Sequence, residues 1–537
     1  MPPAANPEFT PEEARALAPY FTNLDRPVFA LVNLPETVKG ALFARYSRSA
    51  KPLRRLFLDE FLDKIAADGV GPSAGGGDVG LKRAEQLYQK VFSDYGDDSV
   101  AQLGGVHVAV ENASNVLTKL LEWGRLMAYL EQSTRYIPYT DRSGGAWRYH
   151  VPAELEGHPL RAQYVETLDR AFDVYAEWFE RMREHFAARH PRADGDSEGV
   201  HRAAIRAKAL DTLRGLLPAA TESSVGIYAT GQAYEALLLR LRASRLREAH
   251  ACAGLMLEEL RKVIPAFLTR VDVPERGGAW SEYLARARDD AAGAAVRMLD
   301  GETPGERPEV TLSEFDPDGE AKVAAAALYA VTDLPDDQLL DAARRLTADQ
   351  RAAILAAYAG ERRNRRHRPG RAFERTSYRF DVLTDYGAFR DLQRHRLLTL
   401  EWQALSPRHG YSLPGAIEDA GGGDAFREVM DRSAALWQAL SAAGLHEIAP
   451  YSVAMAYRVR FYMHMNAREA MHVIELRTQP QGHPAYRRVC QEMHRLIGEQ
   501  AGHHAIAGIM KHVDHSAVEL ERLQSERALE RKRLSRS

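Results

Sequence analysis

Hydrophobic and polar residues recur along most of the chain with the spacing of amphipathic helices. Apolar residues return every three or four positions, with arginine and glutamate between them, as in helices that bury one face. Clusters of glycine, proline and aspartate, which break helices, fall at 71–78, 189–199, 300–308 and 420–424. The stretches predicted to be helical are 52–68, 159–189, 232–270, 319–359 and 485–511.

Two segments alternate between apolar and polar residues with a period of two. In YRVRFYMHM, residues 457–465, the apolar side chains fall on one side and the charged or polar ones on the other. Residues 376–383 alternate in a similar way. Such alternation predicts strands that are buried on one face. The fold class expected is therefore a helix-rich α+β protein.

The chain shows one order of features twice. The order is a cluster that ends in arginine, then a short stretch with proline, then an apolar helix that ends in Leu-Arg. It occurs first at Arg125, Pro218 and Arg242, and again at Arg396, Pro450 and Arg477. The proline-to-arginine distances are similar, 24 and 27 positions, so the extra residues of the first half lie at about 141–205. The pattern predicts an internal duplication with one copy at 1–272, a second at 319–537 and a linker without clear periodicity at 273–318.

Composition limits the classes of function. The 537 residues are 45% hydrophobic and 27% charged, as in an ordinary globular protein, and suffice for two to four domains. The net charge of −3 provides no overall attraction to nucleic acid or to an anionic membrane. No apolar run of membrane-spanning length and no signal peptide are recognised. Cys252 and Cys490 are too few for a disulfide framework or a cysteine zinc site, so a cytoplasmic protein is expected.

The stretch EWGRLMAYLEQSTRYIPY, residues 122–139, gathers Glu131, Ser133 and Arg135 on a segment of helical appearance. On a helix, Glu131 and Arg135 would form an exposed pair worth roughly 0.3 kcal/mol. In an extended segment all three side chains share one side, and a turn before Pro138 would present a hydroxyl, N–H groups and a guanidinium to a phosphate. Both interpretations remain open at the level of sequence.

Two further clusters lie in the second half. Arg394-His395-Arg396 is either a solvated basic face or a cationic corner able to hold a diphosphate or an electron-rich ring. Asn466-Ala467-Arg468 follows the strand predicted at 457–465 and opens a helix that closes on Leu476-Arg477. Ligands often dock where a helix begins at such a junction, although Asn466 serves equally well as an N-cap.

In this order the clusters resemble the motifs of the flavin-dependent thymidylate synthases. The pattern of that family is R-H-R-x-x-S-x-N-E-x-S-x-R-Y, then R-x-x-L-P, then N-A-R-x-x-x-N-x-x-x-L-R. The resemblance covers most of both halves. It therefore implies two tandem thymidylate synthase-like domains, each helix-rich with a small sheet.

The matching residues are divided between the two copies. The first copy keeps Glu131, Ser133, Arg135, Tyr136, Arg214 and Arg242, but has Trp123-Gly124-Arg125 in place of R-H-R and Gly231-Gln232-Ala233 in place of N-A-R. The second copy keeps Arg394, His395, Arg396, Asn466, Ala467, Arg468 and Arg477. It departs from the pattern at Thr399, Glu401, Trp402, Ala404, Ser406, His446 and His472.

The resemblance implies a reaction and a set of roles. The reaction is the reductive methylation of dUMP to dTMP, with FAD as cofactor, methylenetetrahydrofolate and NADPH as co-substrates, and no enzyme nucleophile. The implied substrate residues are Glu131, Ser133, Arg135 and Arg214 for the phosphate and Arg477 for the pyrimidine. The implied FAD residues are Arg394, His395, Arg396, Asn466 and His472.

The complementary losses imply one composite site shared by the two copies. Because the family is a homotetramer whose sites combine subunits, the resemblance implies a homodimer of this chain that forms a pseudo-tetramer with two sites. Asp391 stands where the family has a glutamine that contacts the pyrimidine. A carboxylate cannot donate the hydrogen bond that an amide donates. Another pyrimidine nucleotide, or a non-catalytic descendant that binds nucleotide or flavin or has a structural role, therefore stays open.

Other site chemistries find less support in the sequence. The C-terminal histidines form no helical metal pattern with carboxylates, and an ordinary amphipathic helix is expected there. These histidines are His494, His503, His504, His512 and His515. The glycine runs at 75–77 and 421–423 lack the Lys-Ser/Thr of a phosphate-binding Walker loop. No metal, nucleic acid or membrane partner is therefore expected.

Overall fold

The computed structural model describes residues 9–46, 49–62 and 102–535. Its contacts divide the chain into two compact units. Unit 1 comprises Met1–Val110, Leu126–Leu130 and Val225–Glu302, and unit 2 comprises Glu111–Arg125, Glu131–Ser224 and Thr303–Ser537. The units therefore differ from the two sequence copies, since the first copy contributes to both.

Unit 1 holds most of a three-stranded sheet with the strand order β1-β3-β2. The strands are β1 (Gly105–Ser114), β2 (Met127–Glu131) and β3 (Glu222–Thr230), and the chain passes from one unit to the other within each of them. The helices of unit 1 are α1 (Pro11–Leu17), α2 (Glu36–Tyr46), α3 (Leu53–Phe57), η1 (Leu58–Leu62), α9 (Gly231–Arg242), α10 (Arg247–Arg261), η5 (Pro265–Leu268), η6 (Pro274–Gly278) and α11 (Ala279–Met298).

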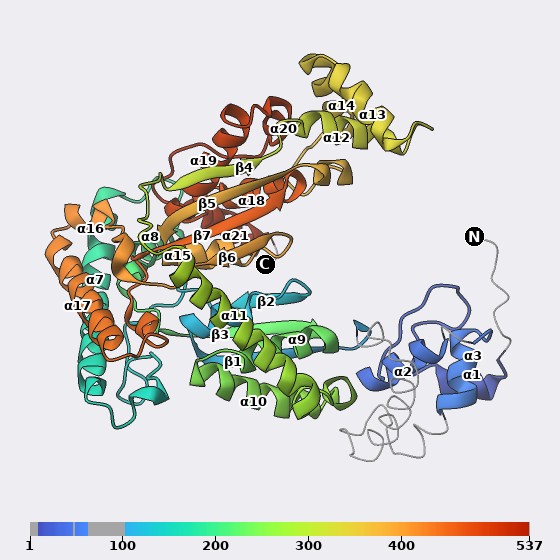
Figure 1. The fold of residues 1–537 in the computed structure, drawn as a ribbon, viewed down its shortest axis with the longest axis horizontal. Helices are drawn as coiled ribbons and strands as arrows, with labels where there is room; N and C mark the ends of the chain where they lie inside the picture. The colour runs from blue at the N-terminus through green and yellow to red at the C-terminus, as the bar shows by residue number, and fades with distance from the viewer. Residues whose placement is uncertain (1–8, 47–48, 63–101, 536–537) are drawn as a thin grey trace. The chain divides into compact units, whose positions relative to one another are not determined.

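Unit 2 is built on a four-stranded antiparallel sheet with the order β4-β5-β7-β6 (Figure 1). The strands are β4 (Val310–Phe315), β5 (Ser377–Asp385), β6 (Thr399–Trp402) and β7 (Arg458–Asn466). The two alternating segments of the sequence coincide with β5 and β7, so both strand predictions are confirmed. Residues of β7 alternate strictly between buried and half-buried, as their polarity predicts.

The helices of unit 2 confirm its helix-rich character. They are α6 (Asn115–Leu121), η3 (Ala153–Leu155), α7 (Leu160–Arg189), α8 (Glu198–Leu213), η4 (Arg214–Leu216), α12 (Gly319–Tyr329), α13 (Asp336–Arg345), α14 (Ala348–Ala359), η7 (Arg371–Arg375), α15 (Tyr386–Gln393), η8 (Pro407–His409), α16 (Gly415–Asp419), α17 (Gly423–Ala442), η9 (Ala449–Ser452), α18 (Ala467–Arg477), α19 (Pro484–Glu499), α20 (His504–Ile509) and α21 (Leu523–Leu534). Among the residues described, no helix is both long and apolar enough to cross a bilayer.

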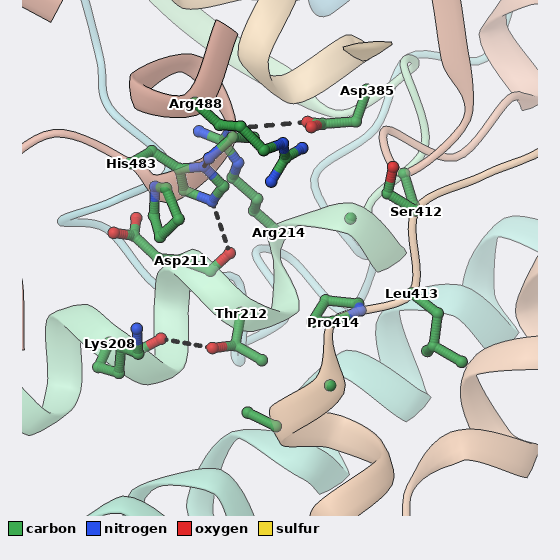
Figure 2. A pocket seen from close by; sticks show the side chains of 16 residues that line it. Lys208, Asp211, Thr212, Arg214, Asp385, Ser412, Leu413, Pro414, His483 and Arg488 are labelled. Atoms are coloured by element: carbon green, nitrogen blue, oxygen red, sulfur yellow. Dashed lines mark hydrogen bonds and ion pairs between the residues drawn. The ribbon is translucent and has the colours of Figure 1, made fainter. Parts of the chain in front are cut away.

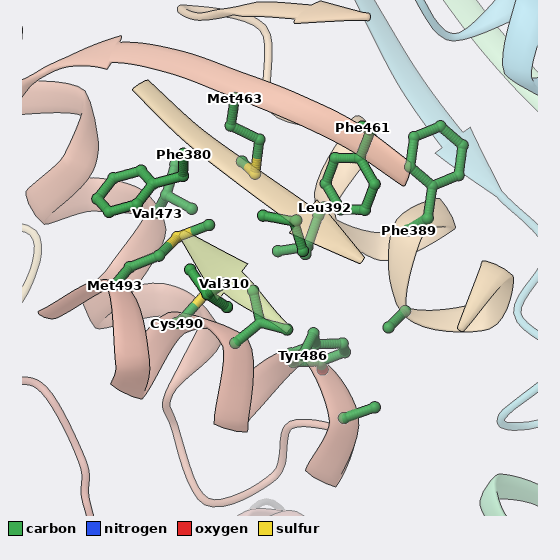
Figure 3. Packing of buried hydrophobic residues seen from close by; sticks show 14 of the residues in the cluster. Val310, Phe380, Phe389, Leu392, Phe461, Met463, Val473, Tyr486, Cys490 and Met493 are labelled. Carbon is green, nitrogen blue, oxygen red and sulfur yellow. The ribbon is translucent and has the colours of Figure 1, made fainter. Parts of the chain in front are cut away.

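The core of unit 2 lies between its sheet and the helices that follow β7. Helix α19 packs on β4 and β5, and Figure 3 shows Cys490 and Met493 of this helix against Val310 and Phe380 of the strands. Phe389 of α15 packs on Phe461 of β7, with ring centroids 4.9 Å apart. Burial of apolar side chains holds α15, which leads directly into Arg394-His395-Arg396, and α18, which ends at Arg477, against one sheet.

The two copies share one order of elements, which confirms the tandem architecture. Strand, helix and strand (β1, α6, β2) in the first copy match β5, α15, β6 in the second, and β3-α9 matches β7-α18. The sheet orders β1-β3-β2 and β5-β7-β6 are the same. Each matched helix begins at a side-chain N-cap, supplied by Ser114, Asp385, Thr230 or Asn466. These caps end the strands and start the helices at equivalent points.

Equivalent segments of the two copies pair with each other inside unit 2. The backbone N–H of Ala219 donates to Val453 at 2.8 Å, and that of Met455 donates to Leu217 at 2.9 Å. The equivalent helices α6 and α15 also meet, since Tyr386 donates to the carbonyl oxygen of Asn115 at 2.9 Å. The copies are therefore joined in an approximately reciprocal way, as expected of a fused pair.

Several predicted boundaries need correction. Residues 127–131 form strand β2 rather than part of a helix. The segment 273–318, expected to be an irregular linker, contains helix α11 and strand β4. The predicted helices over 232–270 and 319–359 are interrupted by short turns, and that over 159–189 coincides with α7. The break predicted at 71–78 and residues 63–68 of the first predicted helix lie outside the described residues.

Candidate functional site

Asp391, on helix α15, is surrounded by arginines from both copies. Arg214 donates to its carboxylate at 3.2 Å, and Arg394 binds the same carboxylate. Arg477 lies 3.9 Å from it and also donates to the Asp391 backbone oxygen. Burial by itself raises the pKa of Asp391, but these guanidinium groups together hold it well below its usual value. The carboxylate is thus ionised and shared by three cations.

Arg135 from the first copy reaches the same region through a different acid. Its guanidinium forms a two-pronged ion pair with Asp211, with both N···O distances 2.6 Å. It also donates to the hydroxyl of Tyr486 at 3.1 Å. The guanidinium of Arg477 lies 5.4 Å from the centre of the Tyr486 ring, so one tyrosine contacts an arginine of each copy. We call Arg135, Asp211, Arg214, Asp391, Arg394 and Arg477 the arginine cluster.

Glu131 anchors the arginine cluster from the end of β2. Its carboxylate accepts from Arg390 at 2.8 Å and lies 3.5 Å from both Lys119 and Arg394. Although burial alone raises its pKa, the three cations lower the pKa of Glu131 to about 2. The exposed Glu131–Arg135 pair considered for a helical segment is therefore not formed. An anionic Glu131 repels a phosphate, so its contacts suit the positioning of Arg390 and Arg394.

His395 holds Arg477 in place. Its Nε2 accepts from Nε of Arg477 at 2.8 Å, which requires a neutral ring with its proton on Nδ1. Burial, followed by the charge of Arg477, keeps the pKa of His395 well below its usual value. The ring of His472 lies edge-on at a centroid distance of 5.6 Å. Arg368 donates to Nδ1 of His472 at 3.0 Å, and burial lowers the pKa of His472 to about 4.

His395, Glu469 and His472 also bring potential metal ligands together. One ligand atom from each lies within 4.8 Å of the others. However, Arg477 and Arg368 donate to the two rings. Arg468 and Arg396 act on Glu469 as further positive charges. This positive surround disfavours a metal cation.

The remaining predicted residues lie around the arginine cluster without joining it. The hydroxyl of Ser133 accepts from the backbone N–H of Arg135 at 3.2 Å, which stabilises the turn after β2. The Asn466 oxygen accepts from the N–H of Glu469 at 2.9 Å as an N-cap of α18, the alternative that the sequence left open. Arg396 is exposed. The structure thus brings together Glu131, Arg135, Arg214, Arg394 and Arg477, and leaves Ser133, Arg396, Asn466 and His472 at the periphery.

Sequence reasoning missed the acids and the tyrosine that organise the cluster. Asp211 lies three residues before Arg214 on one helical face, a spacing that could have suggested a shared site. Asp385, the N-cap of α15, lies 3.6 Å from Arg214, and burial raises its pKa. Tyr486 lies on α19, in a segment without a recognised motif. No local pattern marks Tyr486 as a partner of Arg135.

A pocket of about 370 Å³ adjoins the arginine cluster. Arg214, Asp211 and His483 gather on one side of it, with Leu413 and Pro414 across from them (Figure 2). Burial and Arg214 lower the pKa of His483 to about 3, so the ring is neutral. The Nη2 atom of Arg214 is buried without a hydrogen-bond partner among the described residues. This atom lies 3.6 Å from the carboxylate of Asp385, too far for a hydrogen bond. The volume of the pocket suits a small molecule, and the Arg214 donor suits an anionic group.

The residues assigned to FAD fit an anionic cofactor by charge. Burial raises the pKa of Glu469 to about 7 even though Arg368, Arg468 and Arg396 oppose this shift. The region therefore carries more positive than negative charge near neutral pH. Two neutral imidazole rings, His395 and His472, lie beside these guanidinium groups. Cations next to uncharged rings suit a diphosphate joined to a planar ring system.

Comparison with known proteins adds independent findings. The family model described as thymidylate synthase complementing protein matches residues 55–266 and 311–501. A UPF0159 protein of Chlamydia muridarum is 37% identical over 521 residues, which cover 97% of this chain and 98% of that protein. A UPF0159 protein of Thermoplasma acidophilum is 30% identical over 91% of this chain and 97% of its own length. A flavin-dependent thymidylate synthase of Clostridium tetani is 22% identical over 38% of this chain and 76% of its own.

Proposed function

The chain belongs to the thymidylate synthase complementing protein family, and from this premise we propose that it is a flavin-dependent enzyme acting on a pyrimidine nucleotide. The reaction proposed is the reductive methylation of dUMP to dTMP, with methylenetetrahydrofolate as one-carbon donor and NADPH as reductant. One observation carries the proposal. Arg135 and Arg214 of the first copy converge with Arg394 and Arg477 of the second within unit 2.

The proposed roles follow from what each side chain can reach. Arg214 lines the 370 Å³ pocket, its Nη2 makes no hydrogen bond among the described residues, and it binds the nucleotide phosphate together with Arg135. Arg477, oriented by the acceptor nitrogen of His395, contacts the pyrimidine. Ser133 shapes the turn that carries Arg135. These groups orient and stabilise charge, and none of them serves as a covalent nucleophile.

Arg394 and Arg396 are proposed to hold the diphosphate of FAD, with His395, His472 and the α18 start at Asn466 beside it. FAD, when bound, supplies the hydride that completes the methyl group on the pyrimidine. The neutral state of both histidines follows from their low pKa values. Neutral rings avoid adding charge next to the flavin while they keep Arg477 and Arg368 in position.

The assembly and location proposed are a homodimer that forms a pseudo-tetramer in the cytoplasm. Each chain contributes one arginine cluster, so a dimer carries two composite sites. Cys252 and Cys490 are both buried free thiols, which fits a reducing compartment. The proposed partners are small molecules, without nucleic acid or membrane.

A second candidate is favoured by the charge balance of the cluster. Each arginine proposed to bind substrate already has a carboxylate partner, and Asp391 occupies the centre. A nucleotide phosphate must compete with these acids. This observation favours either a flavin-dependent enzyme for another pyrimidine nucleotide or a descendant that binds nucleotide or flavin without catalysis.

The two candidates are separated by purification followed by complementation. Protein with a flavin absorption band and growth rescue of a thymidine-requiring strain support thymidylate synthesis. A yellow protein that fails to rescue growth supports the second candidate. A colourless protein that takes up no FAD in titration contradicts both enzyme proposals.

A matched pair of variants tests the division of labour between the copies. Arg396→Ala removes an exposed arginine of the flavin motif, and Arg125→Ala removes its exposed counterpart in the first copy. We expect Arg396→Ala to weaken FAD binding at least tenfold in a fluorescence titration and Arg125→Ala to leave it unchanged. Equal effects of the two variants would overturn the assignment of flavin binding to the second copy.

A further inference from the structure

A second pocket, distinct from the one beside Arg214, is lined almost entirely by polar residues. It has a volume of about 640 Å³, within the range of small-molecule sites. One wall is the segment 363–366, RNRR, and the other comprises residues 511–514 together with Gln479. We call this the basic pocket. It contributes nothing to the arginine cluster and contains none of the residues that the family resemblance assigns.

Most cations of the basic pocket have no partner within the described part of the chain. Among the described residues, Arg365, Arg366 and Lys511 make no side-chain hydrogen bond or ion pair, and Arg363 has only an exposed contact of 3.3 Å to Glu361. The acid of the pocket, Asp514, is already paired with Arg487 at 3.1 Å. Four positive side chains therefore line one concavity, and three of them have no internal partner among the described residues. Their mutual repulsion is relieved when an anion binds between them.

A buried arginine, Arg362, holds the two walls of the basic pocket in place. Arg362, itself buried, binds Glu475 of α18 through two bonds of 2.7 and 2.6 Å. The same guanidinium donates to the carbonyl oxygens of His367 and Ile509 at 2.7 and 2.8 Å, and these residues adjoin one wall each in the sequence. A single buried ion pair thus fixes both segments. Binding of a ligand here does not have to order a loose loop.

Two further contacts show that the second wall is equally fixed. Gln479 donates to the carbonyl oxygens of Glu475 and His512 at 2.8 and 3.0 Å. Nε2 of His512 is buried and has no hydrogen-bond partner in the described part of the chain. An unsatisfied ring nitrogen in the wall of a cationic pocket points to a missing ligand or bridging water.

We propose that the basic pocket is a binding site for a diphosphate or triphosphate group of a small molecule, separate from the arginine cluster. Phosphate oxygens accept the forked hydrogen bonds that arginine offers, and neighbouring phosphates match several cations spread along one wall. A single phosphate satisfies fewer of the four cations, so affinity rises from phosphate to diphosphate to triphosphate. This proposal does not depend on the reaction proposed above.

The basic pocket contacts the residues proposed to bind FAD through two sets of interactions. Arg362 is fixed by Glu475, which lies on α18 between His472 and Arg477. Arg368, two residues after the segment 363–366, donates to His472. The charge of Arg365 also lowers the pKa of His472. The basic pocket and the proposed flavin residues are therefore linked by contacts to α18 but share no lining residue.

Titration calorimetry of the purified full-length protein tests the proposal. Inorganic phosphate, inorganic diphosphate and ATP are the probes, and the same titrations are run after saturation with FAD if the protein takes it up. We expect diphosphate and ATP to bind more tightly than phosphate. Arg365→Ala/Arg366→Ala is expected to weaken diphosphate binding at least tenfold. The double variant Arg202→Ala/Arg286→Ala, which removes two exposed arginines elsewhere, is expected to leave it unchanged.

Each other outcome contradicts the proposal. If the wild-type protein does not bind diphosphate, or if both double variants weaken binding equally, the basic pocket is not a diphosphate site. Competition between diphosphate and FAD assigns the pocket to the flavin and removes its separate identity. Binding of a short DNA duplex that depends on Arg365 and Arg366, without binding of diphosphate or ATP, identifies a nucleic-acid surface instead. Circular dichroism and melting temperature verify that each variant is folded.

Discussion

The arginine cluster and the basic pocket are two cationic regions of unit 2 that differ in whether their positive charges are paired with carboxylates. In the cluster, Arg135, Arg214, Arg394 and Arg477 are buried or half-buried and paired with Asp211 or Asp391. In the basic pocket, Arg365, Arg366 and Lys511 are unpaired among the described residues. Burial forces compensation in the first region, whereas partial solvation permits excess charge in the second.

This difference shows that motif arginines and ligand-binding arginines need not coincide. The cluster contains the residues that resemble a phosphate site, yet its charges are largely neutralised by internal acids. The basic pocket lies outside every recognised motif, but its Arg365, Arg366 and Lys511 offer donors that no acid of the described residues occupies. Stability, acid sensitivity and anion affinity should therefore respond differently to mutations in the two regions.

The largest effect is expected from Asp211→Ala. This change leaves the guanidinium of Arg135 buried without its two-pronged partner, so the free energy of unfolding should fall by about 3–5 kcal/mol. Denaturant unfolding followed by circular dichroism measures it. The matched control is Asp336→Ala, which breaks an exposed pair with Arg375 and should cost less than about 1 kcal/mol. Similar losses for both variants would contradict the special role of burial in the cluster.

Acid should destabilise the cluster through Glu131. Its pKa of about 2 in the folded protein lies below the usual carboxyl value of 4.5. Its contribution is therefore fully present above about pH 4.5 and is lost as the pH falls toward 2, amounting to about 3 kcal/mol. Urea unfolding between pH 6 and pH 3 measures how steeply the free energy of unfolding falls with pH. Glu131→Gln should flatten this dependence, and Glu258→Gln, an exposed control, should not. An unchanged slope in Glu131→Gln excludes this linkage.

Asp391→Asn should make the arginine cluster behave more like the basic pocket. The substitution keeps the shape of the side chain but removes the negative charge shared by Arg214, Arg394 and Arg477. Affinity for dUMP should rise about tenfold, or about 1.4 kcal/mol, because the phosphate no longer competes with an internal anion. Calorimetry with dUMP and with deoxyuridine, which lacks the phosphate, distinguishes a gain in phosphate binding from a gain in binding of the nucleoside. A gain for both ligands, or for neither, would show that Asp391 does not compete with phosphate.

The smallest effect is expected from Arg365→Ala/Arg366→Ala on stability. No internal partner is lost and repulsion is relieved, so the free energy of unfolding should change by less than about 0.5 kcal/mol, with any gain confined to low salt. Unfolding at about 0.05 and about 0.5 M salt tests this. A loss of several kcal/mol would mean that these arginines have structural partners after all.

Much of the secondary structure and part of the site followed from the sequence. The alternation in 457–465 predicts β7, and the repeated order of motifs predicts two copies with related elements. The motif match also predicts that residues of both copies act together, and Arg135, Arg214, Arg394 and Arg477 do converge. Strand β2 was missed because five residues are too few to separate a strand period from a helical one. Strand β4 was missed because glycine and proline around it hid its pattern.

The sequence by itself determined the caps, the alternating strands and the identity of the motif residues, because these depend on neighbours a few positions apart. Only the tertiary structure decided which charges are compensated. Asp211 and Arg135 are 76 positions apart, and Asp391 and Arg214 are 177 apart, yet each pair lies within hydrogen-bond distance. Conversely, the one acid close to the basic segment 363–366 in the sequence, Glu361, contacts only Arg363 and leaves Arg365 and Arg366 unpaired among the described residues. The energy of a charge depends on its distance from other charges and from water, and folding sets both.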